Sequence, residues 1–178
     1  ELQTIEETLR YLQFDNWEQS APGLARSYEL LGLLGDPQKK LKFVHIAGTN
    51  GKGSTAAMLA SVLQSAGYRT GLYTSPHLLR FHERMRVNGK EIDDTSLISL
   101  TNAVRNAAER MSEMPTGFEI MTAIAFLYFV QERCDIVSLE VGLGGRMDST
   151  NVIPAPEVCV VANIGLEHTA ILGDTVEK

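Results

Sequence analysis

The stretch with the clearest chemical potential is a glycine-rich segment at residues 45–59, HIAGTNGKGSTAAML. In the usual phosphate loop, G-x-x-x-x-G-K-[ST], backbone N–H groups bind phosphates, the lysine reaches the terminal phosphates and the hydroxyl binds magnesium. Aligned on Gly51 and Lys52, this segment has Ile46 where the first glycine belongs, and its hydroxyl, Ser54, comes one residue late. The strict pattern is therefore not met.

The flanking residues nevertheless favour a phosphate loop, because phosphate binding needs a strand, a glycine-rich turn and a helix N-terminus in that order. Residues 42–47 form a short apolar run rich in β-branched and aromatic side chains, and residues 54–66 repeat apolar residues at helical spacing. A solvated turn with an incidental lysine is the alternative, and the flanks disfavour it. The expected phosphate contacts are Gly48, Thr49, Asn50, Gly51, Lys52, Gly53 and Ser54.

Three further side chains follow predicted strands and could complete a magnesium site. Glu140 lies near the end of the apolar run 135–141, where a buried carboxylate needs an ion pair, hydrogen bonds or a metal. Beside a phosphate loop an acid in this position would hold Mg²⁺, whereas pairing with an arginine is the alternative. His168 and Ser75 follow other strands and would lie on the same sheet edge. On their own, a lone histidine more often lies on the surface and a turn serine more often shapes the turn.

Composition limits the classes of function. The 178 residues are 44% hydrophobic and 21% charged, as expected for one ordinary globular domain. No apolar run approaches the ~20 residues needed to cross a bilayer, so a membrane partner is not expected. A formal net charge of −6 without a long basic run also argues against nucleic acid. Cys134 and Cys159 lie in or beside apolar runs without C-x-x-C spacing, which predicts buried thiols in a reducing compartment, the cytoplasm.

Neither zinc chemistry nor nucleophilic hydrolysis is indicated. Two distant cysteines and four scattered histidines lack zinc-ligand spacing, and no G-x-S-x-G elbow is present. The chemistry is therefore expected to proceed through nucleotide phosphates.

Strands and helices alternate along the chain. Helices are predicted near residues 5–12, 24–34, 54–66, 93–111 and 118–133, and capping boxes at Thr4 with Glu7 and at Thr116 with Glu119 would open the first and the last. Strands are predicted at 42–47, 69–74, 135–141 and 157–164, the last two fully buried, and 75–92 reads as one long loop. This alternation predicts an α/β fold, a mostly parallel sheet with helices on both faces and the site at the carboxyl ends of the strands.

Five stretches, in matching order and with similar spacing, resemble the folylpolyglutamate synthases, including the bifunctional dihydrofolate synthases, of the Mur ligase superfamily. They are HIAGTNGKGS, GLYTSPHLLRFHERMRVNG, FEIMTAIAFLYF, LEVGLGGRMDSTNVI and NIGLEHTAILGDT. The resemblance implies a P-loop NTPase-like domain of the Mur ligase central type. It also implies that the loop is a G-T-N-G-K-[GT]-[ST] variant, in which Gly51, Lys52, Gly53 and Ser54 bind the phosphates of ATP.

The same resemblance implies further site residues. The magnesium ligands would be Ser54, Ser75, Glu140 and His168. The folate or dihydropteroate contacts would be Ala21, Pro22, Gly23, Leu24, Thr116, Phe118, Met147, Asp148 and Ser149. Two positions depart from the family pattern: Glu167 stands where an aspartate is usual, and His82 stands where an asparagine or threonine is usual.

The implied activity is an ATP-dependent amide ligase that adds L-glutamate to a folate or dihydropteroate carboxylate through an acyl phosphate, with Lys52, Glu140 and His168 as catalytic residues. Its partners would be small molecules, and a monomer is expected. Whether dihydropteroate, tetrahydrofolate polyglutamates or both are substrates is left open by the sequence.

The chain would be a single N-terminal ATP-binding domain, residues 1–178, without the family's C-terminal ligase domain. Two features suggested this: there is no initiator methionine, and residues 174–177 have capping-box spacing just before the end. The alternatives are a truncated nucleotide- or pterin-binding module without turnover, and another Mur-type ligase acting on a cell-wall precursor. A generic P-loop kinase fits least, because it leaves the other matching stretches unexplained.

Overall fold

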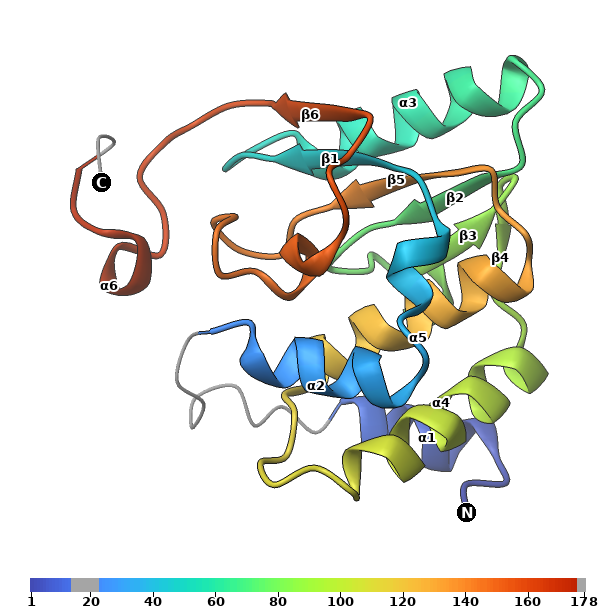
Figure 1. The fold of residues 1–178 in the computed structure, drawn as a ribbon. Coiled ribbons are helices and arrows are strands. Elements are labelled where there is room, and N and C mark those ends of the chain that lie inside the picture. Colours follow the sequence, from blue (N-terminus) through green and yellow to red (C-terminus); the bar gives the residue numbers. More distant parts are fainter. Residues whose placement is uncertain (14–22, 176–178) are drawn as a thin grey trace.

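The computed structural model describes residues 1–13 and 23–175, except for the side chain of Ile171. The helices are α1 (Ile5–Leu12), α2 (Ala25–Leu33), α3 (Lys52–Ser65), α4 (Asp94–Ala108), α5 (Gly117–Gln131) and α6 (Thr169–Leu172). The strands are β1 (Phe43–Ala47), β2 (Thr70–Tyr73), β3 (Met85–Val87), β4 (Lys90–Glu91), β5 (Ile136–Glu140) and β6 (Val158–Val161). Short 3₁₀ turns are η2 (Pro37–Lys40), η3 (Phe81–Arg84) and η4 (Ser149–Val152). Figure 1 labels the α-helices and strands along the ribbon.

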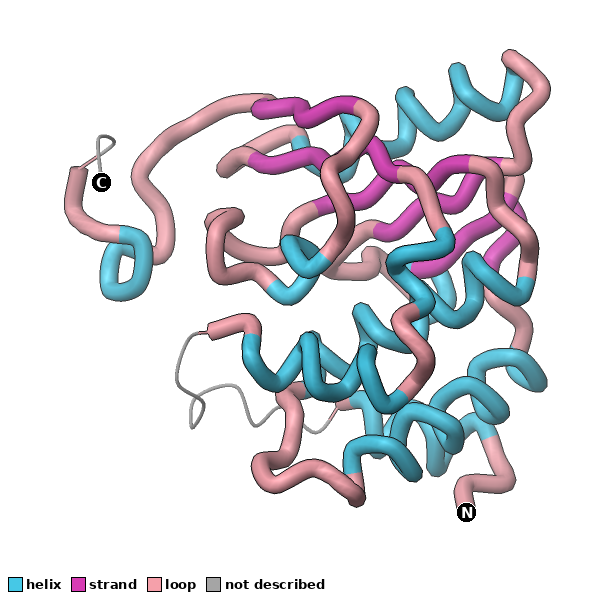
Figure 2. The backbone as a smooth tube through the Cα atoms, in the orientation of Figure 1, coloured by secondary structure: helices cyan, strands magenta, loops and turns pink. Residues whose placement is uncertain are grey.

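The strands form one mixed sheet in the order β4-β3-β2-β5-β1-β6. Strands β2, β5, β1 and β6 are parallel, and β3 and β4 run antiparallel at one edge. The α/β class and the mostly parallel sheet predicted from the sequence are therefore confirmed. Helix α3 covers one face, and the remaining long helices lie on the other (Figure 2).

Each face of the sheet has its own apolar layer, because successive side chains of a strand point to opposite faces. Val44 and Ile46 of β1 pack with α3, in a small cluster that includes Ala56 and Ala60. Phe43 of β1 belongs instead to the larger core with the residues of α5.

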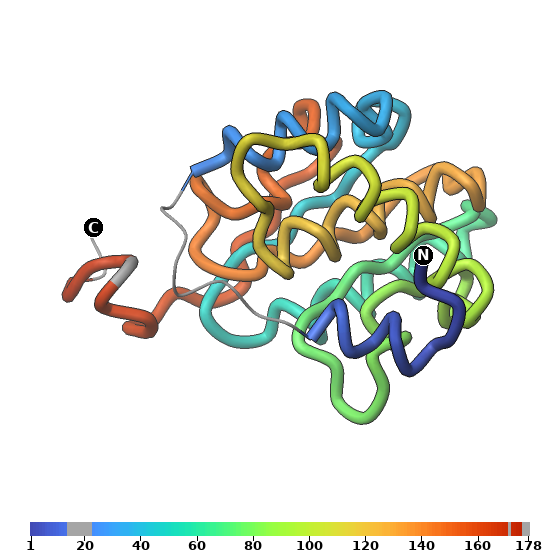
Figure 3. Tube along the Cα trace, turned by 90° about the horizontal axis from the view of Figure 1, so that it is seen from below, coloured from blue at the N-terminus to red at the C-terminus, as the bar shows by residue number. Residues whose placement is uncertain are grey.

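Helix α5 has a strongly apolar sequence and is buried on most of its surface. It packs against α4 and α2, and its side chains share one core with the sheet. Figure 3 shows α4 and α5 close together on this side of the molecule. The capping boxes at Thr4 and Thr116 are both formed. The second one fixes the beginning of α5 beside the site described below.

The prediction of one long loop at residues 75–92 was wrong. This segment contains η3 and a hairpin formed by β3 and β4. The hairpin turns at Asn88 and Gly89, both with positive φ (48° and 77°). An Asn-Gly pair between short strands is a strong signal for a two-residue hairpin turn, so the turn chemistry had been overlooked.

The prediction that residues 157–164 form a fully buried strand was also wrong. Strand β6 lies at the edge of the sheet and pairs with β1, and Val158 and Val161 are 51% and 60% exposed. Cys159 on this strand is exposed, contrary to the expectation of a buried thiol, whereas Cys134 is buried as predicted. An apolar run in the sequence indicates a hydrophobic strand, but it does not indicate whether another element covers that strand and buries it.

The segment after β6 extends beyond the carboxyl ends of the parallel strands (Figures 1 and 3). It carries α6 and most of its side chains are exposed. None of the helices in the described ranges combines the length and apolar character required to span a bilayer.

Candidate functional site

The loop between β1 and α3 depends on glycine at two positions. Gly51 caps α3 in the left-handed conformation (φ 81°), which glycine adopts without strain. Gly48 has φ 139°, and a Cβ there would come within 2.9 Å of the carbonyl oxygen of Asn163. Thr49 ties the loop to the segment after β6: its N–H donates to Asn163 O at 2.6 Å and its hydroxyl lies 3.0 Å from both the N and the O of Gly165.

The start of α3 presents backbone N–H donors that the helix itself does not use. The first intrahelical bond runs from Thr55 N to Gly51 O at 2.9 Å, so the N–H groups of Lys52, Gly53 and Ser54 have no intrahelical acceptor. The Lys52 ammonium folds back on the loop and donates to Gly48 O at 2.6 Å and Thr49 O at 3.1 Å. Free N–H groups, the positive end of the helix dipole and a lysine together make an anion site.

Glu140 ends β5 beside this loop. Its side chain is only 4% exposed, and Oε2 accepts the backbone N–H of Ser75 at 2.8 Å. Gly53 lies against the carboxylate, since a Cβ at that position would be 3.4 Å from Oε2. Burial raises the pKa of the Glu140 carboxyl above its ordinary value, against the opposing effects of Ser75 N–H, Lys52 and Arg84.

The arginine pair considered for Glu140 is not formed, because no ion pair to this carboxylate occurs in the described ranges. Groups of three or more His, Cys, Asp or Glu side chains are also absent from this part of the chain. The site therefore offers one buried carboxylate next to a phosphate-type loop. That donor set suits Mg²⁺, which is commonly held by one or two carboxylates, water and phosphate oxygens.

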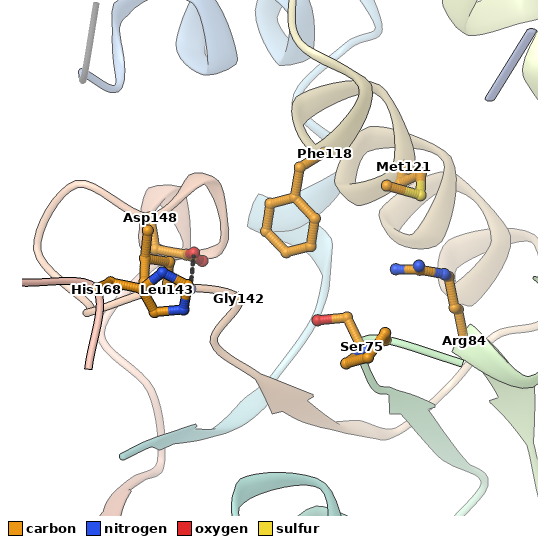
Figure 4. A pocket seen from close by; sticks show the side chains of 9 residues that line it. Ser75, Arg84, Phe118, Met121, Gly142, Leu143, Asp148 and His168 are labelled. Atoms are coloured by element: carbon orange, nitrogen blue, oxygen red, sulfur yellow. Dashed lines mark hydrogen bonds between the residues drawn. The ribbon is translucent and has the colours of Figure 1, made fainter. Parts of the chain in front are cut away.

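A pocket of about 260 Å³ opens next to Ser75 at the carboxyl ends of β2 and β5. Its walls include Ser75, Arg84, Phe118, Met121, Asp148 and His168. In Figure 4 the ring of Phe118 stands in the middle, Asp148 and His168 lie on one side, and Arg84, Met121 and Ser75 lie on the other. The pocket thus combines an apolar centre with polar groups at both ends.

Asp148 is fixed by a buried hydrogen-bond network. Oδ1 accepts the N–H and the hydroxyl of Thr150 at 3.0 and 2.5 Å, and Oδ2 accepts the N–H of Leu143 at 2.8 Å. The hydroxyl of Thr150 lies 2.9 Å from Nε2 of His45, a β1 residue whose pKa is lowered by burial. This network holds the carboxylate at the pocket wall before any ligand arrives.

Gly142 shapes the same wall. A Cβ at this position would lie 2.4 Å from Cζ of Phe118 and 3.0 Å from Oδ2 of Asp148. The absence of a side chain therefore lets the aromatic ring and the carboxylate approach each other across the pocket.

The residues expected to contact a pterin separate into three groups. Phe118 and Asp148 line the pocket. Thr116 and Ser149 are buried beside it: the Thr116 hydroxyl accepts Glu119 N–H at 3.2 Å, and the Ser149 hydroxyl lies 3.2 Å from that of Thr122. Three others, Met147, Gly23 and Leu24, do not line the pocket: Met147 is 55% exposed, and Gly23 and Leu24 precede α2. Ala21 and Pro22 lie outside the described residues.

The expected metal ligands are brought together only in part. Ser75 and His168 line one pocket, and the backbone of Ser75 bonds to Glu140. Ser54 lies in the first turn of α3 and follows Gly53, which lies beside Glu140. His168 has φ 46°, in the left-handed region, and belongs to the exposed segment after β6.

Sequence reasoning missed Arg84, Met121 and His45 as parts of this site. Met121 lies at helical spacing among the apolar residues of α5, a pattern that by itself indicates packing. Arg84 was inside the segment taken for a loop, and an alternation of basic residues in RFHERMRV was the signal that could have drawn attention to it. His45 could be found only through its contact with Thr150, which the sequence does not reveal.

Fold and site together define a nucleotide-binding α/β domain of the phosphate-loop type. A comparison with models of protein families finds no match. Among individual proteins, the chain is 48% identical over 162 residues to the dihydrofolate synthase/folylpolyglutamate synthase of Bacillus subtilis, covering 88% of this chain and 37% of that protein. It is 40% identical over 179 residues to the folylpolyglutamate synthase of Lacticaseibacillus casei, covering 94% and 42%.

Solved structures agree with these relatives. The apo form of the L. casei enzyme superposes with a TM-score of 0.91 at 38% identity, covering 98% of this chain and 43% of that one. The complex of E. coli FolC with DHPP and ADP gives 0.90 at 39% identity, covering 98% and 42%. The chain belongs to the folylpolyglutamate synthase/dihydrofolate synthase family, and it spans about two fifths of the length of these relatives.

Proposed function

We propose that the chain is the ATP-binding domain of an ATP-dependent amide ligase that adds L-glutamate to the carboxylate of folate or dihydropteroate. The observation that carries the proposal is the position of Glu140. Its buried carboxylate lies beside Gly53 of the phosphate-type loop and accepts the N–H of Ser75 at the rim of the pocket. A group at this point can act on a nucleotide phosphate and on a pocket ligand at once.

In this proposal the loop from Gly48 to Ser54 binds the phosphates of ATP. Complexes of related proteins with ADP and with the ATP analogue AMPPCP support it. Ser54, Ser75, Glu140 and His168 would hold Mg²⁺, which neutralises charge on the phosphate oxygens when bound. The buried Glu140, without an ion-pair partner in the described part of the chain, fits this role better than a structural one.

The pocket would take the pterin and its attached ring. Phe118 and Met121 offer apolar contact, and Asp148 offers a fixed acceptor for the N–H groups of a heterocycle. A neighbouring structure at 39% identity and a TM-score of 0.92 is a complex of folylpolyglutamate synthase with AMPPCP and folate, which supports a folate-type ligand. Thr116, Met147, Ser149, Ala21, Pro22, Gly23 and Leu24 remain proposed contacts.

In this reaction the protein mainly positions the reacting groups and neutralises the negative charge of the phosphates. A substrate carboxylate oxygen attacks the terminal phosphorus of ATP and ADP leaves; the glutamate amine then attacks the acyl carbon, loses a proton, and phosphate leaves as the amide forms. Lys52 and the N–H groups at the start of α3 stabilise negative charge on the phosphoryl oxygens. Together with Glu140 and His168, Lys52 is proposed to carry catalysis.

We further infer that residues 1–178 form a single N-terminal domain of a longer cytoplasmic and monomeric ligase. A C-terminal domain would then supply the contacts to adenine and to glutamate. The proposed partners are small molecules. Nucleic acid and membranes are not proposed as partners. A module that binds nucleotide and pterin without turnover is the second candidate, because the phosphate-type loop and the pocket both lie within the described residues.

The test combines binding with turnover. Calorimetric titrations would measure binding of an ATP analogue with Mg²⁺ and of dihydropteroate, and a coupled assay would measure ADP released with dihydropteroate or tetrahydrofolate and L-glutamate. Release of ADP that needs both the pterin and glutamate supports the ligase. Binding of both ligands without ADP release supports the binding module. Failure of the folded chain to bind either ligand contradicts both.

A further inference from the structure

Arg84 brings a guanidinium group to the pocket wall across from Asp148. It lies at the end of η3, immediately before β3. In Figure 4 its side chain points inward below Met121 and beside Ser75, while the Asp148 carboxylate lies beyond the ring of Phe118. The two ends of the pocket therefore carry opposite charges, separated by an apolar ring.

The position of Arg84 is fixed by its neighbours. The N–H of Thr74 donates to Arg84 O at 3.1 Å, so the backbone is held next to Ser75. The side-chain Nε donates to Nδ1 of His77 at 2.9 Å, and the guanidinium carbon lies 5.5 Å from the centre of the Phe81 ring. These contacts use one N–H of the guanidinium and leave its two terminal NH₂ groups without an acceptor in the described residues.

Arg84 differs from the other arginines of the same segment. Arg80 lies 3.6 Å from Glu91, and Arg86 lies 3.9 Å from Glu83 and 3.8 Å from Glu91. No carboxylate of the described residues lies within ion-pair distance of Arg84. A half-buried guanidinium without an acid partner, and with both terminal NH₂ groups facing a pocket, is suited to bind a planar anion by two parallel hydrogen bonds.

We propose that Arg84 binds the carboxylate of the pterin substrate and so sets the direction in which the substrate lies. The heterocycle would face Asp148, which accepts N–H groups and repels a carboxylate, and the aromatic ring would pack against Phe118. The carboxylate would face Arg84 and Ser75, on the side of Glu140. This assignment rests on the proposed function, because it specifies how that substrate is recognised.

The geometry around Ser75 agrees with this direction. Ser75 lines the pocket together with Arg84, and its backbone N–H donates to Oε2 of Glu140 at 2.8 Å, so Arg84 and Glu140 lie on the same side of the pocket. An anion held by Arg84 would therefore sit near the acid that we assign to magnesium. That is the place where a carboxylate must lie to meet a nucleotide phosphate.

A ligand that lacks the charge provides the test. Binding of dihydropteroate and of its carboxamide would be measured by calorimetry for the parent chain, Arg84→Gln, Arg84→Lys and the matched control Arg86→Gln. We expect Arg84→Gln to weaken dihydropteroate binding about 10- to 100-fold, the range for a charge-assisted hydrogen bond, and to leave carboxamide binding nearly unchanged. Arg84→Lys should restore part of the loss, and Arg86→Gln should behave as the parent does.

Two results would overturn the assignment while leaving the proposed function intact. One is equal weakening of both ligands by Arg84→Gln with no rescue by Arg84→Lys, which would indicate a structural role. The other is unchanged binding of both ligands. If the folded parent chain binds neither pterin compound, the proposed function fails and this assignment fails with it.

Discussion

The carboxylate of Glu140 accepts the backbone N–H of Ser75 at 2.8 Å, and this bond joins the carboxyl ends of β5 and β2 at the point where the phosphate-type loop meets the pocket. The two residues are far apart in the sequence, but the parallel pairing of their strands brings them together. The bond orients a buried acid that has no ion-pair partner in the described ranges, which is the basis of the first prediction.

Replacement of Glu140 by glutamine should separate ligand binding from stability. Glutamine keeps an oxygen that can accept the Ser75 N–H and removes the cost of burying a charge, so the free energy of unfolding should stay within about 1 kcal/mol of the parent value. Affinity for an ATP analogue with Mg²⁺ should fall about 10- to 100-fold. Calorimetry and urea unfolding would measure the two effects.

The matched control for that substitution is Glu109→Gln, which changes an exposed glutamate of the Arg105 pair at the end of α4. It should leave nucleotide affinity unchanged. Equal nucleotide affinity of Glu140→Gln and the parent would contradict the magnesium assignment.

Gly142→Ala should damage the pocket more than the fold. The new methyl group would displace the end of the Phe118 side chain, which can move, so the expected cost in stability is at the low end of about 1–3 kcal/mol for overpacking. Displacement of the ring should weaken dihydropteroate binding by about tenfold, or ~1.4 kcal/mol. Gly145→Ala is the control, because a Cβ there meets nothing within 4 Å. Similar binding by the two variants would argue against Phe118 as a ligand contact.

Thr116 is predicted to contribute to stability more than to binding. Its hydroxyl caps α5 by accepting the N–H of Glu119, and loss of such a cap costs about 1 kcal/mol. Thr116→Ala should therefore lower the free energy of unfolding by this amount and change dihydropteroate affinity less than Phe118→Ala does. Thermal unfolding together with pterin titration would distinguish the roles. A larger binding loss for Thr116→Ala than for Phe118→Ala would contradict this prediction and make Thr116 the more important of the two proposed contacts.

Glu83 should make stability depend on pH in the acidic range. Its carboxylate accepts the N–H groups of Leu78, Leu79 and Arg80, and these bonds, Leu78 first, lower the pKa of Glu83 from 4.5 to about 2. Because the pKa of Glu83 is lower in the folded state, its charge stabilises the fold at pH values above the ordinary carboxyl pKa. This contribution is lost as the pH falls toward the lowered pKa. The stability difference between the parent and Glu83→Gln should thus shrink between about pH 5 and about pH 2.

Urea unfolding at several pH values would measure that difference, with Glu91→Gln on the adjacent strand as the control. A difference between the parent and Glu83→Gln that stays constant with pH would show that the bonds to residues 78–80 do not depend on the charge.

Much of the fold could be predicted because its signals are local. Alternating apolar runs and capping residues located the long helices and the parallel strands, and Thr116 with Glu119 marked the start of α5 correctly. The hairpin after β2 was not predicted, although the pair Asn88 and Gly89 is typical of a hairpin turn. Charged residues interrupt the apolar alternation by which its short strands would be recognised. Exposure of β6 could not be predicted, since it depends on which elements lie beside the strand.

The site was predictable where a residue type carries the chemistry at a strand end. Glu140 and Ser75 were placed at the carboxyl ends of their strands by that rule, and the structure brings Ser75 next to Glu140. Arg84 is held at the pocket by contacts with Thr74 and His77, and His45 contacts Thr150, which in turn bonds to Asp148. Such contacts depend on the folded geometry and leave no pattern along the chain.

The most direct test of the account is a calorimetric titration of the chain with a non-hydrolysable ATP analogue and Mg²⁺, repeated with Lys52→Ala and with Lys42→Ala. Lys42 precedes β1, is exposed and lies 3.7 Å from Glu157, so its loss controls for a change in net charge. The account predicts that the parent and Lys42→Ala bind alike and that Lys52→Ala binds about 10- to 100-fold more weakly, as expected for loss of a charged phosphate contact. Equal binding by Lys52→Ala and the parent would contradict the assignment of this loop to nucleotide phosphates.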